Sequence, residues 1–218
     1  METFIQISTI IHIIAGTAAL LFGALAIILK KNTPKHKPVG RVYFWSMTII
    51  FITGVYLSIF KNNIFLFLIA FFTYYSVCIA YRALKLKQLN LTQKPTILDW
   101  TIEIIAGISF IGMIVFAILA YFKSHNFGAI IPLVFGSFGL WGVSRNVKRL
   151  LNKPKQTMVW LKVHIGNMLG SYIGAITAFV VNQMEHIPLP PIVMWLGPAA
   201  ILVPIIVIEL KKVKSQPL

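Results

Sequence analysis

Long apolar runs separated by short polar segments fill the sequence. A bilayer core of about 30 Å is crossed by a helix of about 20 apolar residues, and seven runs reach that length. The predicted spans are residues 4–29, 42–60, 64–82, 98–122, 127–144, 159–182 and 191–210. The segments between them are rich in Lys, Asn and Pro, which favour turns and water. We therefore predict an all-α integral membrane protein with one seven-helix transmembrane domain over residues 1–218.

Composition and charge support a membrane protein and predict its orientation. Apolar residues make up 58% of the chain, above the roughly 45–50% of soluble domains. All 20 Lys and Arg except Lys61 and Lys123 belong to the first, third and fifth connections or to the C-terminal tail. Cytoplasmic loops carry such an excess, so the N-terminus is expected outside and the C-terminus in the cytoplasm. Topology thus explains the net charge of +15, and we expect the lipid bilayer, not nucleic acid, as partner.

Two histidines lie inside predicted spans, where an ionisable group is costly. His12 is about eight residues into the first span, and His164 is about five residues into the sixth. Each is followed by small or flexible residues at helical spacing: Gly16, Ala19, Gly23 and Ala26, and Met168, Ser171, Ala175 and Ala178. Because the two helices run in opposite directions, the histidines should lie in opposite leaflets. They would then serve two separate sites, in each of which the histidine is a candidate axial ligand of haem iron.

Polar residues are also predicted to gather near His164, at the cytoplasmic end of the bundle. Asp99 and Glu103 are four residues apart and therefore share one face of the fourth helix. The other expected members of this inner cluster are Arg41, Arg145 and Asn167. A buried carboxylate needs a partner, so we expect Glu103 to meet His164, Arg41 or Arg145. For Asp99 and the arginines, structural pairing near the headgroups is favoured; for Glu103 and His164, a functional role is favoured.

Three short motifs resemble a known family. They are "HIIAGTAAL" at His12, "HKPVGRVYF" at His36 and "HIGNMLGSY" at His164. Together they resemble a family of uncharacterised prokaryotic multi-pass membrane proteins, catalogued as a domain of unknown function. The resemblance implies a prokaryotic plasma-membrane protein and implies no activity. It also implies importance for the motif residues, which include His12, Gly16, His36, Gly40, Arg41, Tyr43, His164 and Ser171.

Three functions stay open at this point, and enzymatic activity is undecided. The first is a b-type haem or quinone-linked redox protein, in which His12 and His164 bind haem iron. Here His36 completes the inner site, and His125 or His186 completes the outer one. The second is a proton-coupled transporter or channel that uses His164, Glu103 and Arg41. The third is a membrane scaffold or assembly factor whose histidines only form hydrogen bonds between helices.

Overall fold

The computed structural model describes residues 2–29, 33–125, 127–186 and 188–213, apart from the side chains of Ser124 and Phe127. These residues form seven α-helices and one short 3-10 helix, η1 (Phe127–Ala129). The α-helices are α1 (Glu2–Ile28), α2 (His36–Phe60), α3 (Ile64–Lys85), α4 (Ile97–Ser124), α5 (Ile130–Leu151), α6 (Val159–Val181) and α7 (Pro191–Lys212). The predicted all-α class is confirmed.

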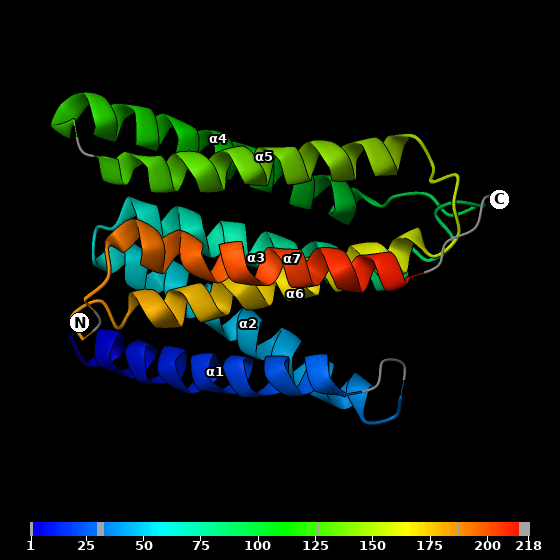
Figure 1. Cartoon of the computed structure of the whole chain (residues 1–218), viewed down its shortest axis with the longest axis horizontal. Coiled ribbons are helices and arrows are strands. Elements are labelled where there is room, and N and C mark those ends of the chain that lie inside the picture. The colour runs from blue at the N-terminus through cyan, green and yellow to red at the C-terminus, as the bar shows by residue number, and fades with distance from the viewer. Residues whose placement is uncertain (1, 30–32, 126, 187, 214–218) are drawn as a thin grey trace.

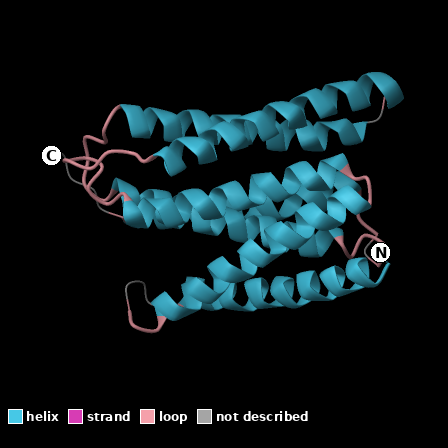
Figure 2. Cartoon of the chain, turned by 180° about the vertical axis from the view of Figure 1, so that it is seen from behind, coloured by secondary structure: helices cyan, strands magenta, loops and turns pink. Residues whose placement is uncertain are grey.

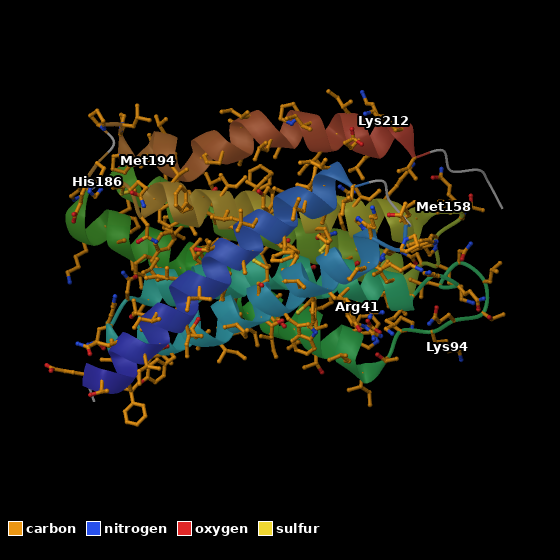
Figure 3. All side chains as sticks on the ribbon, turned by 90° about the horizontal axis from the view of Figure 1, so that it is seen from below. Arg41, Lys94, Met158, His186, Met194 and Lys212 are labelled. Atoms are coloured by element: carbon orange, nitrogen blue, oxygen red, sulfur yellow. The ribbon has the colours of Figure 1, made fainter. Side chains whose placement is uncertain are left out.

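The helices run along one common axis and are joined by short loops at the two ends of the bundle (Figures 1 and 2). Helix α3 is central, because it contacts α2, α4 and α6. Helices α4 and α5 lie along one side, and α1 and α2 lie along the other (Figure 1). We call the end with loops 86–96 and 152–158 the basic end. Arg41, Lys94, Met158 and Lys212 lie toward it, and His186 and Met194 lie toward the far end (Figure 3).

Six of the described helices are long and apolar enough to cross a membrane, and α5 is the exception. The expected fifth span ended at residue 144, but α5 continues to Leu151. Its last two turns carry Arg145, Lys148 and Arg149, which lower its mean hydropathy. Helix α2 also begins earlier than expected, at His36. The correction is that His36 belongs to the first turn of a helix and not to a loop.

The outer surface is apolar and the interior contains small and aromatic residues. Large aliphatic side chains are exposed on α1 and on α4, among them Ile10, Ile13, Ile14, Ile104, Ile108 and Ile111. Such continuous apolar surface suits contact with lipid. Inside, Tyr43, Met47 and Val77 form one buried cluster, and Tyr75, Ile79, Ala106 and Phe110 form another between α3 and α4.

Glycines on α5 allow close contact with α4. A Cβ atom on Gly136 would lie 3.0 Å from the backbone oxygen of Phe110 and 3.2 Å from the backbone nitrogen of Ile114. A Cβ atom on Gly139 would lie 2.6 Å from the ring of Phe110. Because backbone atoms cannot move aside as a side chain can, the α4–α5 contact depends on the absence of a side chain at Gly136.

We expect Gly136→Leu to lower the free energy of unfolding by about 1–3 kcal/mol, because the added side chain forces α4 and α5 apart. Unfolding in mixed micelles measures the change. Gly107→Ala is the control on α4, since a Cβ atom there would meet no atom within 4 Å. The control should keep or slightly raise stability, as alanine is the better helix former. Equal stability of Gly136→Leu and the wild type would contradict the close packing.

Candidate functional site

His12 links α1 to α2. Its Nδ1 lies 2.8 Å from Oγ1 of Thr53, whose hydroxyl donates to the backbone oxygen of Ile49 at 2.7 Å. Since that hydroxyl proton is already used, the imidazole Nδ1–H is the donor to Thr53. The ring also lies beside Gly54, where a Cβ atom would be 3.5 Å from Cε1 of His12. These contacts place His12 near the end of α2, toward the far end of the bundle.

His164 and His36 lie toward the basic end. Nδ1 of His164 is 3.0 Å from the backbone oxygen of Ala80 on α3, so this nitrogen donates. His36 begins α2, and its backbone N–H donates to Oγ1 of Thr33 at 3.3 Å. Its Nδ1 atom is buried and has no hydrogen-bond partner among the described residues. The structure thus separates His12 from His164 along the bundle.

A buried carboxylate is the centre of the polar site. Glu103 on α4 is only 3% exposed. The hydroxyl of Tyr75 on α3 donates to Oε2 of Glu103 at 3.0 Å, and the side-chain amide of Asn146 on α5 donates to Oε1. Arg149, one turn after Asn146, acts on Glu103 through its charge. Three helices therefore converge on one carboxylate, and we call Tyr75, Glu103, Asn146 and Arg149 the Glu103 cluster.

Asp99 lies one helical turn before Glu103 and has a different environment. Arg82 on α3 holds it with two bonds, Nε to Oδ1 at 2.6 Å and Nη2 to Oδ2 at 2.9 Å. The backbone N–H of Thr96 donates to Oδ2 at 2.7 Å as part of the capping box of α4. The hydroxyl of Thr96 donates to the same oxygen at 2.8 Å. This is a two-pronged ion pair that also caps a helix, so Asp99 has a structural role.

The difference between the two acids decides what each can do. Asp99 is neutralised by direct contact with a guanidinium group. Glu103 receives its hydrogen bonds from a phenol and an amide, both neutral, while Arg149 interacts with it only electrostatically. A carboxyl group with neutral donors can be retained in both its ionised and its protonated form, because no contacting cation is left unpaired by protonation.

The other residues expected in the inner cluster lie elsewhere. Arg41 is exposed near the start of α2 (Figure 3). Arg145 is also exposed, and its guanidinium carbon lies 4.8 Å from the centre of the Trp141 ring. Asn167 donates to the backbone oxygen of Val163 in its own helix at 2.9 Å. The partner found for Glu103 is thus none of the three expected cations.

Four residues of the site were not predicted: Tyr75, Arg82, Asn146 and Arg149. In the sequence pattern, Arg82 and Arg149 appear only as charges that mark the cytoplasmic side. The sequence does contain a pattern that could have indicated these four residues, because residues three, four or seven apart share a helix face. Tyr75 and Arg82 are seven residues apart on α3, and Asn146 and Arg149 are three residues apart on α5. Each pair therefore presents polar groups to the face of α4 that carries Asp99 and Glu103.

Two residues of the family motifs meet directly. The hydroxyl of Tyr43 is 2.8 Å from Oγ of Ser171, and both side chains are buried. Ser171 donates its own proton to the backbone oxygen of Met168, so Tyr43 is the donor to Ser171. Gly40 and Gly16 are different, because a Cβ atom on either would meet no atom within 4 Å. Packing explains the tyrosine and the serine and does not explain these two glycines.

Two hollows occur at opposite ends of the bundle. A small recess at the basic end is lined by Arg149 together with residues of loops 86–96 and 152–158. An apolar pocket of about 360 Å³ at the far end is lined by Phe65, Phe116, Ile131 and neighbouring residues. Phe116 is 13 residues after Glu103 on α4, about 20 Å along the helix. Of these two hollows, the recess is therefore the one that adjoins the Glu103 cluster, through Arg149.

The fold and the buried charged site define a multi-pass membrane protein of helical type. A family model described as "Predicted membrane protein (DUF2306)" matches residues 9–138, which is more than half of the chain. The chain therefore belongs to this family, and the expected resemblance to an uncharacterised multi-pass family is confirmed. The match includes Tyr75, Arg82 and Glu103, while Asn146 and Arg149 lie beyond it. No curated protein and no solved structure matches the chain.

Proposed function

We propose that this protein carries protons across the membrane and that Glu103 is the proton-binding group. The observation that carries the proposal is the contrast on α4 between Asp99, bound by Arg82, and Glu103, bound by the neutral donors Tyr75 and Asn146. Ionisable residues inside membrane helices commonly mark proton paths, because burying them without a use is costly. Glu103 is the one of the two acids that can exchange a proton without losing an ion-pair contact.

Arg149 supports a route for protons from the basic end. It acts on Glu103 through its charge and also lines the recess between the two basic loops. A single side chain thus connects the buried acid with the surface of the bundle.

The basic end is proposed to face the cytoplasm of a prokaryotic cell, with the protein in the plasma membrane. Support comes from the loops at this end, which carry most of the lysines and arginines. With this orientation the Glu103 cluster lies in the inner leaflet. His36 and His164 lie toward the same end, and His12 toward the other.

Haem as a cofactor is a less well supported proposal. A transmembrane b-type haem with two axial histidines needs them on facing helices. The bonds described for His12 and His164 join them to Thr53 and Ala80, at opposite ends of the bundle. In the described part of the chain no group of three or more His, Cys, Asp or Glu is placed to hold a metal ion. Each of the two histidines would thus need a second ligand at its own end of the bundle. Haem and quinone-linked redox chemistry therefore rest on the sequence pattern of the histidines alone.

Reconstitution in liposomes tests the proposed function. An inside-negative potassium diffusion potential is imposed on proteoliposomes that contain a pH-sensitive dye, and internal acidification is recorded. We expect faster acidification than in protein-free liposomes of the same lipid. Acidification at the protein-free rate would overturn the proposal and would favour the scaffold interpretation.

A further inference from the structure

We propose that the recess at the basic end binds a phosphate group, either from an anionic phospholipid headgroup or from a soluble phosphate. The recess lies between loop 86–96, loop 152–158 and the start of α6. Two cations, Arg149 and Lys87, and two amides, Asn90 and Gln156, are among its lining residues, and none of the described lining residues is an acid. This inference does not require Glu103 to bind a proton.

The two loops that form the recess are fixed to each other. Nζ of Lys153 donates to the backbone oxygen of Leu91 at 3.0 Å and so joins one loop to the other. Within loop 86–96, the side-chain amide of Gln93 donates to the backbone oxygen of Lys85 at 2.7 Å. Beneath the loops, Leu86, Leu89 and Leu150 form a buried cluster against Trp100. The recess is therefore preorganised, which lowers the entropic cost of binding.

Arg149 at the recess has unused capacity to bind an anion. Nε of Arg149 is buried and has no hydrogen-bond partner among the described residues. An unsatisfied buried donor costs about 1–3 kcal/mol, so a ligand that accepts this proton gains affinity. Nζ of Lys87 lies 4.8 Å from the centre of the Trp160 ring and at the same recess. Arginine and lysine together are the usual binding groups for phosphate oxygens.

The size and position of the recess indicate how phosphate would bind. Its volume of about 10 Å³ accommodates one water-sized atom, so a single phosphate oxygen enters and the rest of the group stays outside. Helix α6 begins at Val159, beside the recess, and its N-terminus adds a favourable dipole for an anion. Basic pockets between membrane helices are known to take anionic headgroups.

Thermal unfolding of the full chain in neutral detergent tests the inference. Three additions are compared: phosphatidylglycerol, phosphatidylcholine and inorganic phosphate. Stabilisation by phosphatidylglycerol alone assigns the site to a lipid headgroup, and stabilisation by inorganic phosphate assigns it to a soluble phosphate, because a ligand of the folded state raises the unfolding temperature. We expect Lys87→Glu to lose most of the increase. Lys94→Glu is the matched control, as Lys94 is exposed in the same loop and does not line the recess.

Two results would overturn the inference. One is the absence of stabilisation by any phosphate-containing addition beyond that of phosphatidylcholine. The other is an equal loss in Lys87→Glu and Lys94→Glu, which would show general attraction to the basic end. Glu103→Gln protein is measured in parallel and should retain the stabilisation. Binding by this variant separates the phosphate site from the proton-carrying role of Glu103.

Discussion

Glu103→Gln is expected to reduce proton entry into proteoliposomes to the protein-free rate. Glutamine has the shape of glutamate, and its one carbonyl oxygen can accept the bond from Tyr75 or the bond from Asn146 but not both. It cannot bind and release a proton at neutral pH. The substitution therefore removes the chemistry and keeps most of the packing. The measurement is the initial rate of dye response at equal amounts of folded protein.

Glu185→Gln is the matched control, because Glu185 is exposed in the loop after α6. Its proton flux should equal that of the wild type. Tyr75→Phe adds an intermediate case: it removes one donor to Glu103 and leaves the carboxylate. We expect this variant to retain flux with an altered pH dependence. Undiminished flux in folded Glu103→Gln protein would contradict the role assigned to Glu103.

Arg82→Ala is expected to lower the free energy of unfolding by about 3 kcal/mol, because it leaves Asp99 buried without its cation. Asp99 is only 3% exposed when Arg82 is present, so its charge depends on this guanidinium group in the folded chain. Its remaining bonds come from Thr96 and help to cap α4, and they compensate only in part. Unfolding by denaturant in mixed micelles gives the change in free energy.

Arg82→Lys and the double variant Arg82→Ala with Asp99→Asn separate charge from geometry. Lysine keeps the charge and cannot form the two-pronged contact, so an intermediate loss is expected. The double variant removes the uncompensated carboxylate, so it should be more stable than Arg82→Ala alone. If Arg82→Ala were as stable as the wild type, the ion pair would be an exposed contact of little consequence.

The number, order and approximate limits of the helices could be predicted from the sequence, because hydrophobic length is a strong constraint in a bilayer. The limits of α2 and α5 could not. Both helices extend into polar sequence at the basic end, where the hydropathy signal stops. Good helix formers continue α5, whereas the first turns of α2 contain Pro38 and Gly40, and the proline is tolerated because it lies in the first turn. His36 and Arg149 are thus helical residues that apolar length alone does not reveal.

The candidate site was predicted in part. Asp99 and Glu103 were identified because an acid inside a span is rare and the two share a helix face. The partners of these two acids depend on which helices are neighbours of α4. The depth of a residue in the membrane, which the sequence predicts, does not determine these neighbours. Arg82 on α3 and Asn146 on α5 meet α4 in the bundle, whereas Arg41 at the same end does not meet Glu103. The packing of the helices therefore determines which of the side chains at this depth contact Asp99 and Glu103.

Infrared difference spectroscopy of carboxyl groups tests most directly whether Glu103 exchanges a proton. The chain has only five acidic residues, so the carbonyl stretching band of a protonated acid can be assigned by single substitutions. On acidification of the reconstituted wild type, we expect such a band from a buried acid. The band should be absent in Glu103→Gln and present in Asp99→Asn and Glu185→Gln. An unchanged band in Glu103→Gln would contradict the assignment of Glu103 as the proton-binding group.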